Sequence, residues 1–191
     1  MAIGLILEDP VFKENYKLED CYLAICDANR DAAGFLIRYR GATKAEQTRK
    51  IRLRSNNSFV FESVSISSAL REIPRIYNGS RDAVVVANDN FDTIDYAKFF
   101  FDCGTPGNRR LRKIKSNYAE CIPVVNRILE PARNVVSCYP VFFAKIENSK
   151  KKNDNAAHVL CTNEARNLKK SRIKKDLKHL CKNGYYDNIQ I

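Results

Sequence analysis

The alternation of apolar and charged residues is most regular at residues 50–54, where two apolar side chains separate three cations, Lys50, Arg52 and Arg54. A period of two is typical of a half-buried strand, and it places these cations together on the solvent face. Residues 55–58 supply Asn and Ser, which favour turns. We therefore predict a two-stranded unit with its return strand at residues 59–67.

A second run, at residues 35–40, has the same period and places Arg38 and Arg40 on one side of a predicted strand. If this strand pairs with residues 50–54, the cations of both strands form one basic sheet surface. Bases could then stack on nearby rings while the cations bind phosphates, and the candidate rings are Tyr39, Phe59 and Phe61. The alternative is that these rings belong to the hydrophobic core.

The remaining patterns predict short elements of both kinds. In chain order they are an edge strand at 1–7, a short helix at 68–76, a buried strand at 82–87, core residues at 96–103 and a basic loop at 104–115. Prolines at positions 123, 131 and 140 favour strands and bends over a single helix across residues 117–147.

Residues 164–182 have the period of an amphipathic helix, with one apolar stripe and a basic opposite face. Thr162 or Asn163 would cap its start, and Gly184 would end it. A basic amphipathic helix can bind nucleic acid, dock on an anionic membrane or act as a nuclear import signal, and the pattern leaves all three open.

Together these patterns predict an α+β protein with a mainly antiparallel sheet core, short helices and a basic C-terminal helix. The composition changes at Lys150, which predicts two units, a core domain at residues 1–149 and a basic helical tail at residues 150–191. A chain of 191 residues is long enough to bury a core without disulfides.

Composition narrows the class of protein. With 45% hydrophobic and 29% charged residues, the chain is typical of soluble globular proteins, and its longest apolar run is too short to span a bilayer. The first residues lack the basic and apolar regions of a secretory signal, so we expect an intracellular protein, cytoplasmic or also nuclear. The seven cysteines are then expected to be reduced thiols.

The net charge of +11 is concentrated in three blocks, at residues 41–56, 107–150 and 151–191. Segregated positive charge creates a local potential that favours polyanionic partners, although a solubilising surface is the alternative. The candidate phosphate contacts are Arg38, Arg40, Lys50, Arg52, Arg54, Arg109, Arg110, Arg112, Lys169, Lys170, Arg172, Lys174 and Lys175.

Three carboxylates at a spacing of three follow the predicted buried strand, and they are Asp89, Asp92 and Asp95. Beside a basic groove, such a group at a strand end would suit Mg²⁺ and a metal-dependent nuclease. The alternative is an acidic turn that caps a following helix.

Both histidines of the chain lie in the tail, and each has a cysteine close by. Zinc is bound by these residue types, so the candidate ligands of one ion are His158, Cys161, His179 and Cys181. On a continuous helix His179 and Cys181 point in nearly opposite directions, so a shared ion requires the helix to end before His179. Packed thiols and solvated histidines are the alternative, and no other cofactor is expected.

The basic segment at residues 169–175, with these Cys and His residues around it, resembles the accessory proteins of positive-strand plant RNA viruses. The resemblance covers about the last forty residues and is one of composition, and the Cys-x-x-Cys pair frequent in that family is absent here. Several of those proteins bind RNA and suppress host RNA silencing. The resemblance implies a host–virus interaction in which duplex RNA is occupied and withheld from host nucleases.

The predicted function is RNA binding with weak sequence specificity, by a protein that is not an enzyme and has no catalytic residue. RNA is the expected partner, and a homo-oligomer is compatible with the sequence. Three alternatives account for the same charge pattern: a structural nucleoprotein such as a coat or movement protein, the Mg²⁺-dependent nuclease, and a module whose basic helix binds an acidic protein.

Overall fold

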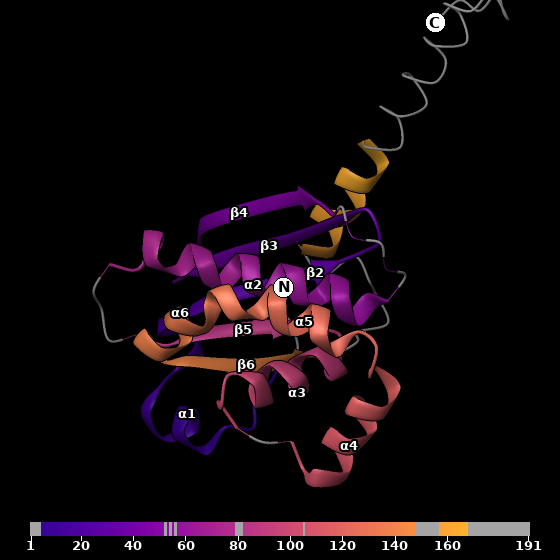
Figure 1. Ribbon diagram of the computed structural model, residues 1–191. Helices are drawn as coiled ribbons and strands as arrows, with labels where there is room; N and C mark the ends of the chain where they lie inside the picture. The colour runs from indigo at the N-terminus through magenta and orange to yellow at the C-terminus, as the bar shows by residue number, and fades with distance from the viewer. Residues whose placement is uncertain are drawn as a thin grey trace, which may run out of the picture.

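One mixed sheet organises the computed structural model, which describes residues 5–51, 53, 55, 57–78, 82–104, 106–147 and 157–167 of the chain (Figure 1). Its strand order within that part of the chain is β1-β6-β5-β2-β3-β4. The strands are β1 (Leu5–Ile6), β2 (Tyr22–Ala28), β3 (Ala32–Tyr39), β4 (Ala42–Lys50), β5 (Val84–Asn88) and β6 (Val141–Ile146).

Antiparallel pairs join β2 to β3, β3 to β4 and β1 to β6, whereas β5 lies parallel to both of its neighbours, β2 and β6. The predicted α+β class with a mainly antiparallel sheet is therefore confirmed. The parallel centre has a geometric consequence, because it brings the carboxyl ends of β2, β5 and β6 to the same edge of the sheet.

Helices cover both faces of this sheet. The front face in Figure 1 carries most of them, and the other face carries α1 and the helix at residues 157–167. Their bounds are α1 (Pro10–Asn15), α2 (Ser58–Ile76), α3 (Phe91–Phe100), α4 (Asn108–Asn117), α5 (Ile122–Leu129) and α6 (Arg133–Cys138), with short 3-10 turns η1 (Leu18–Asp20) and η2 (Glu130–Ala132).

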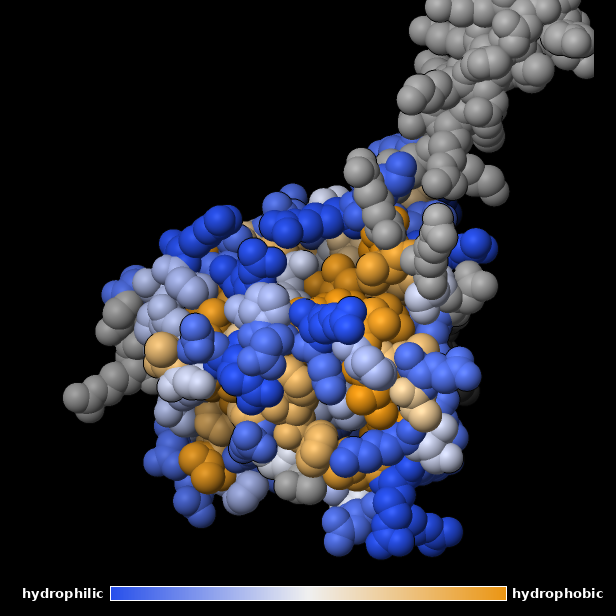
Figure 2. Space-filling view, in the orientation of Figure 1, coloured by the Kyte–Doolittle hydropathy of each residue, from blue (hydrophilic) through white to orange (hydrophobic). Residues whose placement is uncertain are grey.

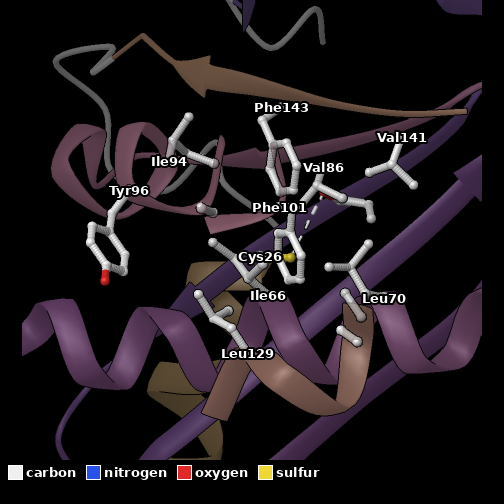
Figure 3. Packing of buried hydrophobic residues seen from close by; sticks show 14 of the residues in the cluster. Cys26, Ile66, Leu70, Val86, Ile94, Tyr96, Phe101, Leu129, Val141 and Phe143 are labelled. Carbon is white, nitrogen blue, oxygen red and sulfur yellow. Dashed lines mark hydrogen bonds between the residues drawn. The ribbon is translucent and has the colours of Figure 1, made fainter. Parts of the chain in front are cut away.

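The main core lies between α2 and the sheet, and Figure 3 shows its packing. Ile66 and Leu70 of α2 are fully buried there, next to Val86 of β5 and Phe143 of β6. Every residue of β5 is buried because helices cover both of its faces, which explains the apolar run at residues 84–87 that precedes Asn88.

The predicted return strand at residues 59–67 is wrong, because these residues form the first half of α2. The side chain of Asn57 accepts a hydrogen bond from the backbone N–H of Phe59 (3.0 Å) and so caps the helix. Buried positions recur at the helical spacing over residues 59, 63, 66, 70 and 73. That periodicity extends through the predicted helix at 68–76, so the two predicted elements are one.

Strand 35–40 is confirmed within β3, but its partner is β4 and not residues 50–54. The two strands meet at a two-residue turn in which Arg40 and Gly41 both have positive φ (50° and 78°). Turns with this geometry match the twist of a hairpin. The alternation at residues 50–54 begins at the last residue of β4, and Ile51 is buried just beyond it.

The predicted loop at 104–115 is wrong over α4, where Leu111 and Ile114 are buried. Strands across residues 117–147 are likewise wrong except for β6. Pro123 and Pro131 are the second residues of α5 and η2, within the first turn, where the missing N–H has no helical partner to lose. Prolines therefore start helical elements here.

In the carboxyl-terminal region, the described residues 157–167 are helical, and Thr162 and Asn163 lie inside that helix and not at its cap. Ala157 and Cys161 are fully buried against the sheet. The remainder of the predicted helix at 164–182 lies outside the described residues, and the domain boundary at residue 149 stays a prediction. No helix of the described residues combines the length and apolar character needed to cross a membrane.

The capping contact of α2 gives a direct test of the corrected element. Asn57→Ala is expected to lower the free energy of unfolding by about 1 kcal/mol, because the first turn loses its side-chain acceptor. Asn57→Ser retains an acceptor and should restore most of that loss. Urea denaturation of both variants measures the effect, and equal stability of the two would contradict a helix that begins here.

Candidate metal centre

Three acidic side chains meet at the edge of the sheet where the parallel strands end. Asp27 is near the end of β2, Asp89 directly follows β5, and Glu62 lies in the second turn of α2. The parallel pairing of β2 with β5 aligns the two strand ends, and α2 packs across them. The triad therefore combines elements that lie far apart in the sequence.

One carboxylate oxygen of each residue lies within 4.8 Å of those of the other two. The residues Asp27 and Glu62 are only 3% and 4% exposed, whereas Asp89 is half-buried. Two members of the triad are thus buried, and Asp89 is the member that solvent reaches.

Asn88, the last residue of β5, connects the parts of the site. Its side-chain amide donates to the backbone oxygen of Cys26 (2.9 Å) and to Oε2 of Glu62 (2.8 Å), while its Oδ1 accepts from the N–H of Asn90 (2.8 Å). Asn88 is fully buried. These bonds tie β2, α2 and the start of α3 together around the triad.

Asp27 is held from the other side by residues 157–167. Nδ1 of His158 lies 2.8 Å from Asp27 Oδ2, and the Cys161 thiol donates to the Asp27 backbone oxygen (3.1 Å). The second carboxylate oxygen, Oδ1, accepts the N–H of Ala28 (2.9 Å). Both ends of the carboxylate therefore have a fixed partner.

The electrostatics of the triad disfavour three free negative charges. Burial, reinforced by the charge of Asp89, raises the pKa of Asp27 from 3.8 to about 6, although His158 opposes the shift. Burial, reinforced by the charge of Asp27, raises the pKa of Glu62 well above its usual range. The charge of Asp89 therefore makes ionisation of both Asp27 and Glu62 harder.

A hard divalent cation is the ion that such a group of carboxylates would bind best. Mg²⁺ and Mn²⁺ prefer carboxylate oxygens, and a cation would replace mutual repulsion by attraction. No other group of three potential metal ligands this close together is found among the described residues. The donor set of Asp27, Glu62 and Asp89 fits a magnesium-type site.

The acidic group predicted from sequence is only partly right. Asp89 belongs to the triad, but Asp92 is ion-paired with Arg110 and accepts the Tyr118 hydroxyl (2.8 Å). Asp95 contacts Lys145 (2.8 Å) and Arg110 (3.1 Å). Because α3 begins after Asn90, it places the last two carboxylates away from the first.

The zinc prediction has no support in the described residues. His158 and Cys161 both contact Asp27, and the thiol is fully buried with its hydrogen directed to a backbone oxygen. His179 and Cys181 lie outside the described residues.

The predicted phosphate contacts lie in separate places. Arg38 and Arg40 lie near the β3–β4 turn, where Arg40 pairs with Asp20 (3.5 Å), whereas Lys50 is at the other end of β4. The single basic sheet surface expected from sequence is therefore wrong for these three, and Phe59 and Phe61 are core residues. Arg109 and Arg112 are exposed on α4, whereas Arg110 is ion-paired. The other candidates, outside the described residues, are Arg52, Arg54, Lys169, Lys170, Arg172, Lys174 and Lys175.

Asp27 and Glu62 were missed because each lies in an apolar run, Asp27 after Ala24-Ile25-Cys26 and Glu62 after Phe59-Val60-Phe61. That context was itself a signal, because an unpaired buried carboxylate is costly unless a specific partner or ligand offsets the cost. The prediction that the protein is not an enzyme is contradicted by this acidic group, because three carboxylates that could hold a metal ion meet at the ends of the parallel strands.

No protein-family model and no curated protein matches the chain. Among solved structures, the chain is similar to that of RNase H1 from the halophilic archaeon Halobacterium salinarum NRC-1, with a TM-score of 0.49 and 14% sequence identity. The match covers 75% of this chain and 98% of that one.

The raised pKa of Asp27 predicts how stability depends on pH without a divalent metal. The folded state binds a proton up to about pH 6, whereas the unfolded carboxyl releases it near pH 4, so the free energy of unfolding falls as the pH rises through this window. Asp27→Asn removes this titration and should be more stable than the wild type by about 3 kcal/mol at pH 8, with little difference at pH 4.

Urea denaturation in EDTA at pH 4, 6 and 8 measures the difference. The control is Asp31→Asn, which removes an exposed carboxylate from the turn between β2 and β3. A wild type that gains stability from pH 4 to pH 8 relative to Asp27→Asn would refute the repulsive triad.

Proposed function

We propose that this protein is a nuclease that uses divalent metal to hydrolyse phosphodiester bonds in nucleic acid. The observation that carries the proposal is the convergence of Asp27, Glu62 and Asp89 within 4.8 Å at one end of the sheet. These three residues would hold the metal. When bound, a divalent ion activates water and stabilises the charge that develops on the phosphate.

A protein that only bound a polyanion would gain nothing from this triad. Three carboxylates repel a phosphate backbone, and two of them are buried at a cost in free energy. A bound cation would offset the charge of the carboxylates, which lowers the cost of burying them, and it would attract the phosphate that they otherwise repel. The triad therefore favours catalysis over sequestration of nucleic acid.

The basic helix α4 supplies a surface for the polymer. Its exposed cations Arg109, Arg112, Lys113 and Lys115 face solvent, and its apolar residues Leu111 and Ile114 anchor it to the core. Figure 1 shows α4 at the lower right of the molecule, and Figure 2 shows this corner as strongly hydrophilic.

A cleft of about 590 Å³ lies between α3, α4 and the end of β6. Three cations, Lys98, Arg110 and Lys145, line it together with three carboxylates, and one of these, Asp95, pairs with Arg110 and Lys145. Lys145 is the register partner of Asn88, the residue before Asp89, so the cleft begins next to the triad. A strand that crosses the triad would pass over this cleft towards α4.

RNA stays our proposed polymer among the nucleic acids. The viral suppressor of RNA silencing and its intracellular location stay predictions, as do the homo-oligomer and the structural nucleoprotein.

Cleavage assays test the proposal directly. Purified full-length protein is incubated with labelled single-stranded RNA, single-stranded DNA, their duplexes and an RNA–DNA hybrid, with Mg²⁺, Mn²⁺ or EDTA. We expect cleavage of at least one substrate with metal and none in EDTA. Glu62→Gln and Asp89→Asn should each lower the rate by about 100-fold or more, because each removes a metal ligand.

The matched control is Glu72→Gln, the same substitution further along α2, where the side chain pairs with Arg75 at the surface. It should leave the cleavage rate unchanged. Metal-independent cleavage, or full activity of the triad variants, would overturn the proposal.

Nucleic-acid affinity tests the role of α4 separately from catalysis. In EDTA, the combined variant Arg109→Ala/Arg112→Ala/Lys113→Ala should bind single-stranded RNA at least about 10-fold more weakly at low salt. The slope of log affinity against log salt should fall by about two, since each lost phosphate contact contributes roughly 0.7.

Fluorescence anisotropy at several salt concentrations measures both quantities. Arg75→Ala is the control, because this exposed cation lies roughly 20 Å along α2 from Glu62. An unchanged affinity of the combined variant would exclude α4 from the interface.

A further inference from the structure

The helix at residues 157–167 is seated on the sheet directly beside Asp27. Ala157 packs with the apolar residues of the face that α1 also covers, and both Ala157 and Cys161 are fully buried. The helix exposes Val159 on its other side. Its contact with the sheet is therefore well defined, and His158 lies at the rim of this contact.

Gly34 makes this seat possible. It is the cross-strand partner of Asp27 in the β2–β3 ladder. A Cβ at this position would lie 2.8 Å from the Cys161 sulfur, 3.1 Å from Cγ2 of Thr48 and 3.2 Å from the backbone oxygen of Gln47. Because Gly34 has no side chain, it leaves room opposite Asp27 for the thiol of Cys161.

The helix contacts Asp27 twice, once at each end of the residue. The Cys161 thiol donates to the backbone oxygen, and His158 Nδ1 contacts the carboxylate Oδ2. One contact fixes the main chain and the other fixes the rotation of the side chain. An aspartate held in this way has little freedom to turn away from Glu62 and Asp89.

His158 acts through Asp27 and is not itself a member of the triad. The group of potential ligands that lie close together consists of Asp27, Glu62 and Asp89. His158 is a described residue, but it is not part of this group. Its Nδ1 is already engaged by the carboxylate, and its side chain is 38% exposed. A histidine of this kind is a partner of a metal ligand, and such partners typically contribute 10–100-fold to metal affinity.

We propose that His158 is a positioning residue, and that the helix at residues 157–167 completes the metal site by orienting the Asp27 carboxylate towards Glu62 and Asp89. The inference rests on the proposed nuclease function, because it assigns the triad to a metal. It adds that the sheet without this helix would bind the metal weakly. It also predicts that substitution of His158 lowers the affinity for the metal.

Mn²⁺ binding to the full-length protein tests the inference without any nucleic acid. Isothermal titration calorimetry is carried out on the wild type, His158→Ala, His158→Asn and Val159→Ala. We expect the Mn²⁺ affinity of His158→Ala to fall by about 10–100-fold. His158→Asn keeps a donor at the position of Nδ1 and should recover most of the affinity, while Val159→Ala should match the wild type.

Gly34→Ala gives an independent test from the opposite strand. Its methyl group displaces the Cys161 thiol and should lower Mn²⁺ affinity by a similar factor, with His158 still present. Thermal melts in EDTA are recorded for each variant, so that a loss of folding is distinguished from a loss of metal.

The outcomes separate the two proposals. If the wild type binds no Mn²⁺, the proposed function fails, and the inference fails with it. If the wild type binds Mn²⁺ through the triad but His158→Ala binds equally well, the proposed function stands and His158 has no positioning role. Equal losses in His158→Ala and His158→Asn would also overturn the inference, because the hydrogen bond would then not be the cause.

Discussion

Repulsion among three carboxylates at one end of the sheet is the interaction on which the rest of this structure depends. Asp27 and Glu62 are almost fully buried, and their raised pKa values reflect both burial and the neighbouring charges. The fold tolerates this because Asn88 donates to Glu62 and His158 contacts Asp27. These bonds hold the oxygens where repulsion would otherwise separate them, in an arrangement that a bound divalent cation would stabilise.

The parallel centre of the sheet gives this site its position. β2 and β5 end together, α2 lies across them, and residues 157–167 close the opposite side. The antiparallel strands β3 and β4 support the site indirectly, through the glycine that receives the Cys161 thiol. Negative and positive charge lie in different places. Two members of the acidic triad are buried, whereas the cations of α4 are exposed.

Local patterns predicted part of this arrangement. The strand within β3, the buried strand β5 and the edge strand β1 follow from periodicity and β-branched residues, and Asp89 was recognised at its strand end. The first half of α2 was mistaken for a strand because Phe59, Val60 and Phe61 look like a buried run, although the helical spacing continues to Ile73. The triad depends on pairing between strands that lie more than fifty residues apart, which no local pattern contains.

X-ray diffraction from crystals soaked in Mn²⁺, recorded at the manganese absorption edge, tests the central claim most directly. The account predicts an anomalous peak bonded to carboxylate oxygens of Asp27, Glu62 and Asp89, which disappears in crystals of Glu62→Gln. Well-ordered triad side chains without an anomalous peak between them, at Mn²⁺ concentrations that saturate ordinary magnesium sites, would contradict it.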